Sequence, residues 1–227
     1  MRPLHAHRLG TVPYLEAHAL QERLVAARKD GAIPDTLLLL EHPPVVTLGR
    51  GAKDGSNLRV SREEFAAHGV EVHETGRGGD VTYHGPGQMV AYPILDLAPD
   101  REDVRKYVAT LEETMIRLAA DWGVTAERFE GFNGAWVEPK VRPRKIGAVG
   151  VRISRWVTMH GLAFNLAPNL AHFELIVPCG LHGKGVTSLQ RECEASELPT
   201  MEELMERAGA HFAEIHASEL IWQPALP

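Results

Sequence analysis

FELIVPCGLHGKGVTSL, residues 173–189, ends an apolar run at Pro178 and places Cys179 directly after it. Three glycines follow within the next six residues, at positions 180, 183 and 185. Proline and glycine mark places where a backbone turns or lets another group approach closely. We therefore expect an extended segment that breaks into a turn and presents the Cys179 thiol as a nucleophile. A small buried cysteine without a chemical role fits this stretch, taken alone, about as well.

Composition limits the class of protein. The chain has 227 residues, 44% of them hydrophobic, and a net charge of −6, which speaks against a general binder of nucleic acid or membrane surfaces. No apolar stretch approaches the roughly 20 residues that span a bilayer, and the N-terminal residues lack the apolar segment of a secretory signal. Cys179 and Cys193 are too few for a disulfide framework in a chain of this size. These features predict a reduced, cytoplasmic protein.

Hydrophobic periodicity and capping signals predict a mixture of helices and strands. Helices are predicted over 11–29, from a capping box at Ser61 and Glu64 to about 69, from a cap at Asp100 or Asp103 to about 123, and from a capping box at Thr200 and Glu203 to about Leu220. Strands are predicted over 36–40, 45–49, 70–74, 89–95, before Phe129, and over 134–137, 146–153 and 156–166. Because helices and strands do not alternate regularly, we expect an α+β or mixed α/β fold with a mixed or mainly antiparallel sheet, and neither a Rossmann fold nor a barrel.

The segment GRGGDVTYHGPGQ, residues 76–88, has the composition of a ligand-binding loop. Its five glycines let a ligand approach the backbone, and Arg77, His84 and Gln88 lie among them. The spacing matches neither a dinucleotide fingerprint nor a Walker A loop. The alternative is a pair of hairpin turns.

The basic run at 140–145 is followed by an apolar strand, and Lys145 is the first residue of its alternation. A lysine there tends to be partly buried, and burial or neighbouring cations lower a lysine's pKa until it can act as a base. A solvated surface lysine is the alternative. His160, in the strand 156–166, is best explained by itself as a satisfied core histidine. No HExxH or paired CxxC motif predicts a metal site.

Three segments together resemble the octanoyltransferases of lipoate biosynthesis. The matching runs are GRGGDVTYHGPGQ at 76–88, RKIGAVGVRISRWVTMHGLAFNL at 144–166, and IVPCGL with GVTSL at 176–189. They arrive in the order and spacing of that family, over a motif-bearing part of about 36–190. The resemblance implies a single catalytic domain over 1–227, with the fold of biotin- and lipoate-protein ligase catalytic domains: a mixed sheet flanked by helices around an elongated acyl pocket.

The resemblance also implies the site. Cys179 is the implied acyl-accepting nucleophile and Lys145 its acid–base partner. We predict in addition that His84 orients the acyl carbonyl or the cysteine and is not the base. The implied pocket residues are Arg77, Gly78, Gly79, Asp80, Val81, Thr82, Tyr83, His84, Ala148, Val149, Gly150, Gly161, Leu162 and Ala163.

By the same resemblance, octanoyl-acyl carrier protein donates the acyl group. The acceptors are the lipoyl domains of 2-oxoacid dehydrogenase E2 subunits and the glycine-cleavage H protein. No metal, cofactor or ATP is implied. Two alternatives remain: an ATP-dependent lipoate or biotin ligase of the same fold, and a non-enzymatic acyl-binding module that would tolerate the loss of Cys179 and Lys145.

Overall fold

The computed structural model describes residues 1–52, 57–177, 184–194, 198–224 and 226. Its elements in chain order are β1 (Arg2–Thr11), α1 (Tyr14–Lys29), β2 (Asp35–Glu41), β3 (Val45–Leu48), α2 (Arg62–Ala67), β4 (Glu71–Glu74), β5 (Val81–His84), β6 (Gln88–Ile94), α3 (Val104–Ala120), β7 (Glu127–Phe129), β8 (Phe132–Val137), β9 (Arg144–Ser154), β10 (Val157–Asn165), the 3-10 helix η1 (Leu170–Leu175), β11 (Gly185–Val186), α4 (Leu189–Glu192), α5 (Met201–Ile215) and β12 (Ser218–Trp222).

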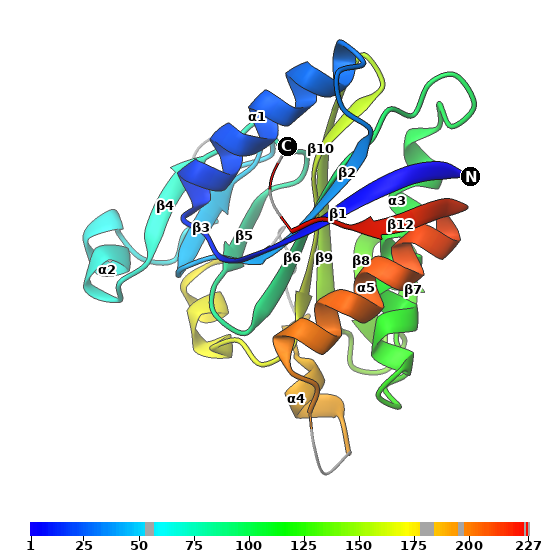
Figure 1. Ribbon diagram of the computed structural model, residues 1–227. Coiled ribbons are helices and arrows are strands. Elements are labelled where there is room, and N and C mark those ends of the chain that lie inside the picture. The colour runs from blue at the N-terminus through cyan, green and yellow to red at the C-terminus, as the bar shows by residue number, and fades with distance from the viewer. Residues whose placement is uncertain (53–56, 178–183, 195–197, 225, 227) are drawn as a thin grey trace.

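A large mixed sheet forms the centre of the molecule (Figure 1). Among the described residues its strands follow the order β12-β1-β2-β6-β10-β9-β8-β7, and the short β11 also pairs with β9. The pairs β1–β12, β1–β2 and β9–β11 are parallel, whereas β2–β6, β6–β10, β10–β9 and β9–β8 are antiparallel. The predicted mixed sheet with flanking helices is confirmed.

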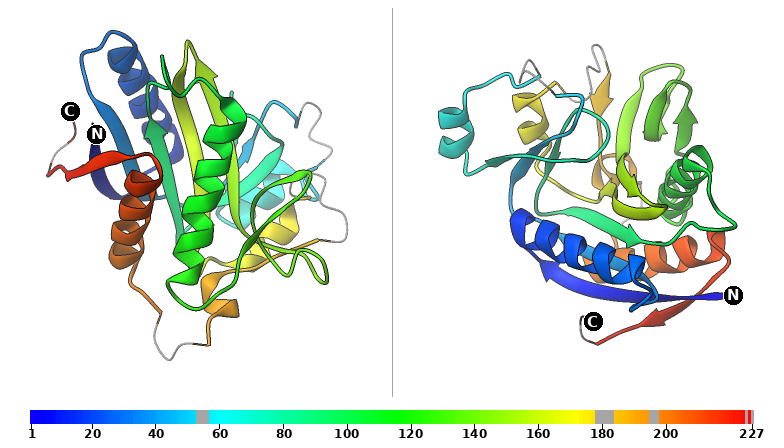
Figure 2. Two further views of the ribbon diagram at one scale, coloured as in Figure 1. Left: turned by 90° about the vertical axis from the view of Figure 1, so that its right-hand side faces the viewer. Right: turned by 90° about the horizontal axis from the view of Figure 1, so that it is seen from above.

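The central strand β2 shows why this sheet is covered on both faces. Its leucines alternate, so that Leu37 and Leu39 pack in the cluster with α3 and α5, and Leu38 and Leu40 in the cluster with α1. A strand covered on both sides is a continuous apolar run. Burying each of these leucines stabilises the fold by about 1.5–3 kcal/mol. Figure 1 shows α1 on one side of the strands and α3 with α5 on the other; α3 and α5 lie side by side (Figure 2).

A second, smaller sheet carries the glycine-rich segment. Its strand order is β4-β3-β5, and its own small core includes Val46, Phe65, Tyr83 and Ile176. The turn before β5 is tied to the residues after β3 by the bonds Gly49 N–H to Asp80 O and Gly51 N–H to Gly79 O, each 2.9 Å. Gly78 N–H donates to Val151 O of β9, also at 2.9 Å. The small sheet therefore holds residues 76–80 against β9 of the large sheet.

Three of the four predicted helix starts are confirmed by their caps. The first predicted helix begins at Tyr14 and not at Thr11, and Pro13 before it makes no side-chain cap. The Ser61–Glu64 and Thr200–Glu203 capping boxes are both formed, and Asp103 accepts a hydrogen bond from the backbone N–H of Lys106 at the start of α3.

Among the described helices, none combines the length and the apolar character that crossing a lipid bilayer requires.

Two expectations about the chain ends are corrected. The last helix ends at Ile215 and not near Leu220, because Ala217 takes a left-handed conformation (φ 49°) and Ser218–Trp222 then pairs with β1. Residues 2–10, for which no element was predicted, form β1 together with Thr11, which was expected to begin the first helix. Both errors have one source, since β1 and β12 depend on a pairing between opposite ends of the chain.

The apolar run before Pro178 is also not simply extended. Residues 170–175 form a 3-10 helix, whose start is capped by Asn169 accepting from the N–H of Ala171. Phe173 and Ile176 belong to the small core, which explains the apolar character of the run without a strand. Cys179 itself lies outside the described residues.

Candidate active site

A cavity of about 510 Å³ lies where the glycine-rich segment meets β9 and β10. These two strands run next to each other in the large sheet (Figure 1). The remaining walls come from the first residue of α1, the first turns of α3 and the β7–β8 hairpin. The cavity thus draws on elements from much of the chain.

Most of the residues that the resemblance assigns to the acyl pocket line this cavity. They are Arg77, Gly78, Gly79, Thr82, His84, Ala148, Val149, Gly150, Gly161, Leu162 and Ala163. Lys145 lines the same cavity.

Asp80, Val81 and Tyr83, which the resemblance also implies, are absent from the cavity lining. Val81 and Tyr83 alternate with Thr82 along β5, and their side chains pack in the small core instead. The Asp80 carboxylate accepts hydrogen bonds from the N–H of Val81 and from the Asn57 amide. Side chains along β5 alternate between its faces, so Thr82 and His84 line the cavity while Val81 and Tyr83 face the small core.

Lys145 is a buried lysine, only 8% exposed. It pairs in register with Trp136 of β8 and Val186 of β11, so its backbone is held between two neighbouring strands. Its Nζ lies 4.7 Å from the centroid of the Trp136 ring, a cation–π distance. The alternative of a solvated surface lysine is therefore excluded.

Carboxylates compensate the positive charge of Arg144, the last residue of the basic run before Lys145. Arg144 donates to Glu192 at 2.7 and 2.8 Å and to Glu138 at 2.6 Å. These bonds to Glu192 and then Glu138 raise the pKa of Arg144. The positive charge of Arg144, the nearest basic neighbour of Lys145 in the sequence, is thus largely neutralised.

Arg77 is a buried guanidinium that fastens the glycine-rich segment to β3. It donates to the backbone oxygen of Thr47 at 2.6 Å, to the Thr47 hydroxyl at 2.9 Å and to Gly78 O at 3.1 Å. It lines the cavity and is 7% exposed. Arg77 therefore contributes both a scaffold and a positive charge at this wall.

Three buried histidines stand in or beside the cavity, and all are neutral at physiological pH. Burial lowers the pKa of His42 to about 4, of His84 to about 3 and of His160 to about 3. The positive charge of Arg77 adds to the effect at His84 and His160. Desolvation disfavours the charged imidazolium, so these rings can donate or accept hydrogen bonds but carry no charge.

The glycines of the lining serve close packing more than open space. A Cβ on Gly161 would overlap the backbone oxygen of Ala91 and lie 2.6 Å from Cδ of Pro93. A Cβ on Gly150 would lie 3.2 Å from Gly78 O and 3.3 Å from Cδ of Arg77. The first glycine lets β10 approach β6, and the second lets the glycine-rich segment approach β9.

Several lining residues were missed by sequence reasoning. They are Tyr14, Tyr92, Val104, Val108, Phe132, Asn133 and Val151. Only Val104 and Val108 had a usable signal in the sequence, because they form an i, i+4 apolar pair at a helix start. In the structure the Val104 side chain remains 45% exposed.

His160 was expected to be a core histidine with its hydrogen bonds satisfied; the burial is confirmed, but the hydrogen bonding is not. The ring is buried, 2% exposed, but within the described structure its Nε2 has no hydrogen-bond partner, and it lines the cavity. Its backbone (φ 60°) is held by a bond from its N–H to Oε1 of Gln21 at 2.8 Å. Tyr14 likewise presents a buried hydroxyl without a partner in the described part of the chain.

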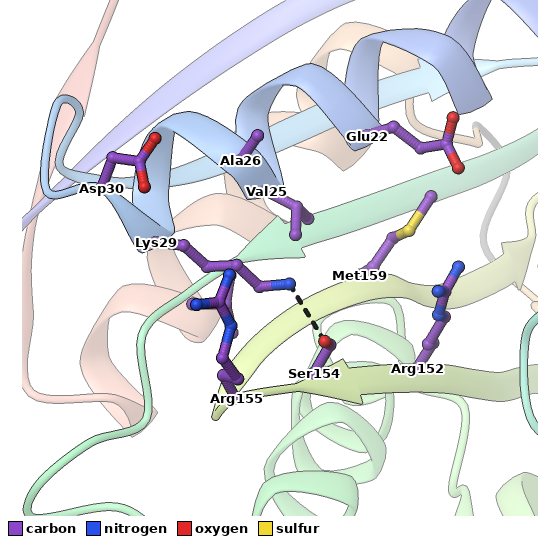
Figure 3. A pocket seen from close by; sticks show the side chains of 10 residues that line it. Glu22, Val25, Ala26, Lys29, Asp30, Arg152, Ser154, Arg155 and Met159 are labelled. Atoms are coloured by element: carbon purple, nitrogen blue, oxygen red, sulfur yellow. Dashed lines mark hydrogen bonds between the residues drawn. The ribbon is translucent and has the colours of Figure 1, made fainter.

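A second cavity, about 340 Å³, lies between α1 and the β9–β10 hairpin (Figure 3). Lys29 crosses it to donate to the Ser154 hydroxyl at 3.0 Å, with Arg155 close by. Burial and the charges of Arg155 and Arg152 lower the pKa of Lys29. None of the predicted site residues lines this cavity, so we take the larger one as the candidate active site.

Among the described residues, no group of three His, Cys, Asp or Glu side chains is placed to hold a metal ion.

The fold is similar to that of known lipoate protein ligases. A lipoate protein ligase from Thermoplasma acidophilum with bound lipoic acid superposes with a TM-score of 0.76, over 98% of this chain and 89% of that chain, at 14% identity. A lipoate-protein ligase A bound with ATP gives a TM-score of 0.74 over 97% and 90% of the two chains, also at 14% identity. A sequence profile of the lipoyl protein ligase A/B catalytic domain matches residues 13–213, and the chain belongs to this family.

Within that family the chain belongs with the octanoyltransferases. The octanoyltransferase of Acidobacterium capsulatum is 46% identical over 94% of this chain and 90% of its own length. That of Chloroflexus aurantiacus is 47% identical over 96% of both chains. The octanoyltransferase of Myxococcus xanthus is 47% identical over 99% of this chain, which spans 62% of that protein's length.

Proposed function

We propose that this chain, acting as one catalytic domain, transfers an octanoyl group from octanoyl-acyl carrier protein to a lysine of lipoyl domains. Cys179 carries the acyl group as a thioester between the two steps, and Lys145 moves the protons. The acceptors are the lipoyl domains of 2-oxoacid dehydrogenase E2 subunits and the glycine-cleavage H protein. A reducing compartment, the cytoplasm, suits an enzyme that depends on a reduced thiol.

The observation that carries the proposal is the position of Lys145. A buried lysine stands in the wall of the same cavity as the glycine-rich segment and the strand residues 148–150 and 161–163. Apolar groups line the cavity nearby, among them Leu162, Val108 and Phe132. An apolar cavity beside an amine base suits an acyl chain whose reacting carbonyl lies near the base.

In the first half-reaction, neutral Lys145 takes the proton of the Cys179 thiol, and the thiolate attacks the carbonyl carbon of the donor thioester. A new carbon–sulfur bond forms, the bond to the carrier's sulfur breaks, and the carrier leaves as a thiol with the proton returned by Lys145. A free thiol with a pKa near 8.5 is only a few per cent ionised at neutral pH, so a base in the cavity is needed.

In the second half-reaction, the amine of the acceptor lysine attacks the octanoyl-enzyme thioester. The carbon–nitrogen bond forms, the bond to Cys179 breaks, and the amine proton passes through Lys145 to the released thiolate. Thioester exchange is near balance and amide formation from a thioester runs downhill. ATP is therefore not required.

The test is the intact mass of the full chain after incubation with octanoyl-acyl carrier protein. The wild type should gain one octanoyl group and lose it again on addition of a lipoyl domain. Cys179→Ala should gain none and transfer none. An octanoyl adduct that persists in Cys179→Ala would overturn the proposal.

Cys193→Ala is the matched control. Cys193 donates to the backbone oxygen of Trp122 at 3.2 Å and packs against the main core, so it has a structural setting of its own. This variant should retain both the adduct and transfer. The ligase alternative is tested in the same assay, since transfer that requires ATP and free octanoate would replace the thioester route.

A further inference from the structure

A chain of buried hydrogen bonds leads from the cavity to the strand that follows Cys179 in the sequence. Nδ1 of His84 lies 2.6 Å from Oε1 of Gln88. The Gln88 amide nitrogen lies 2.9 Å from Oδ1 of Asn165, and the Asn165 amide nitrogen lies 2.8 Å from the backbone oxygen of Thr187. Thr187 N–H in turn donates to the backbone oxygen of Lys145 at 2.9 Å. His84, Gln88, Asn165 and Thr187 are all buried.

Backbone carbonyls, which can only accept, determine which atom donates and which accepts in each of these side-chain hydrogen bonds. Thr187 O requires that the Asn165 NH2 group point toward it, so Oδ1 of Asn165 points toward Gln88. The backbone oxygen of Tyr83, 3.2 Å from the Gln88 nitrogen, independently requires the Gln88 NH2 group on that side. Oε1 of Gln88 is therefore the atom that faces His84, and it can only accept.

The proton on His84 follows from this. Since Oε1 of Gln88 accepts, Nδ1 of His84 must carry the hydrogen and donate it. A neutral imidazole holds one N–H, which leaves Nε2 as a bare acceptor. His84 lines the cavity and its Nδ1 is turned to Gln88, so we infer that Nε2, on the opposite side of the ring, is the nitrogen available to a group in the cavity. Burial supports the neutral ring by lowering the pKa of His84 to about 3.

We propose that Gln88 and Asn165 are positioning residues that hold His84 in its Nδ1–H tautomer, so that Nε2 accepts a hydrogen bond from the amine of the acceptor lysine. This inference rests on the proposed transfer reaction. The attacking amine carries two N–H groups. One proton is lost to Lys145, and a hydrogen bond to the other N–H fixes the orientation of the amine, so that its lone pair points at the carbonyl carbon. This tautomer does not fit the first of the two roles expected for His84, because a bare Nε2 cannot donate to the acyl carbonyl; orienting the cysteine stays a prediction.

The tautomer is measured directly, without substrate. In long-range proton–nitrogen NMR spectra of the labelled full chain, Nδ1 of His84 should show the shift of a protonated nitrogen and Nε2 that of a bare one, from pH 8 down to about pH 5. An Nε2–H tautomer, or an imidazolium at pH 6, would overturn the assignment. This readout is independent of transfer, so it stands even if Cys179 proves not to carry the acyl group.

The positioning role is tested with Gln88→Met, which removes the acceptor. This variant should populate the Nε2–H tautomer and slow attack of a lipoyl domain on isolated octanoyl-enzyme about tenfold, the loss expected for one hydrogen bond. Acylation of the enzyme by the donor should change by less than about threefold. Equal slowing of both half-reactions, or no slowing of the second, would refute the role.

Two further variants separate positioning from mere packing. Gln88→Glu retains an acceptor for Nδ1 and should keep the Nδ1–H tautomer and react faster than Gln88→Met in the second half-reaction, although it loses the donor that Gln88 gives to Tyr83 O and Asn165 Oδ1. Gln190→Met makes the same chemical change at an exposed glutamine and should alter neither the spectrum nor the rates. A Gln88→Glu variant as slow as Gln88→Met, with the tautomer intact, would show that His84 does not act through its tautomer.

Discussion

Lowering the pH from about 7.5 to about 5.5 should destabilise this protein sharply, because four of its described histidines are buried without a charge. Burial lowers the pKa to about 4 for His42 and His216 and to about 3 for His84 and His160. An unfolded histidine has a pKa near 6.5. The folded pKa lies below the unfolded one, so the unfolded state binds more protons, and stability falls as the pH drops below about 6.5 and continues to fall to about pH 4.

The size of the effect follows from the same values. At pH 5.5 an unfolded histidine is about nine-tenths protonated while the buried ring remains neutral, which costs about 1.4 kcal/mol per residue relative to high pH. Four such residues give a loss of about 5 kcal/mol. A loss of this size is comparable with the whole stability of many domains, about 5–15 kcal/mol.

The assay is urea denaturation of the substrate-free protein at pH 7.5, 6.5 and 5.5. His216 offers a test outside the cavity: its ring lies against Phe212 with centroids 4.3 Å apart and the rings tilted by 31°, and its Nε2 lies 3.0 Å from the Thr110 hydroxyl. His216→Gln should reduce the difference between pH 7.5 and 5.5 by about 1.4 kcal/mol. His68→Gln, at an exposed position, is the matched control. Equal stability of the wild type at the two pH values would refute the reasoning.

Three further predictions concern the site and its supporting strands. Lys145→Met should slow alkylation of Cys179 at pH 7 about tenfold, restored at higher pH, and an unchanged rate–pH profile would remove Lys145 from the mechanism. Gly161→Ala should cost about 1–3 kcal/mol in urea denaturation because its Cβ would overlap Ala91 O and separate β10 from β6, and an unchanged denaturation midpoint would contradict this packing. A butyryl donor, four methylenes shorter than octanoyl, should lose roughly 3 kcal/mol, on the order of a hundredfold in kcat/KM, whereas palmitoyl should be penalised by overpacking; equal rates for all three donors would mean that the chain is not buried in the cavity.

Local patterns carried most of the fold prediction. Capping residues such as Ser61 and Thr200 mark helix starts because their side chains bond to N–H groups only a few residues away. The burial of Lys145 was also predictable, since it stands at the start of an apolar strand and is followed by the buried Ile146. Strand period alone would have separated Val81 and Tyr83 from Thr82, had it been applied to the residues implied by resemblance.

What escaped prediction depends on contacts between distant segments. Tyr14 reaches the cavity because α1 packs on β10 and β6, and nothing in its neighbourhood of the sequence marks it. The roles proposed for Gln88 and Asn165 required the positions of two backbone carbonyls, those of Tyr83 and Thr187. Such residues become visible only when the three-dimensional pairing is known.

The pairing of β1 with β12 has a consequence for synthesis of the chain. Arg2 is in register with Ser218, so β1 cannot complete its pairing with β12 until residues 218–222 have been made (Figure 2). Until then β1 leaves the ribosome with one side unpaired, a template on which another nascent copy can assemble. Strand pairing between such distant residues is slow. We expect the window between translation of β2 and release of β12 to be the stage at which this protein most needs a chaperone.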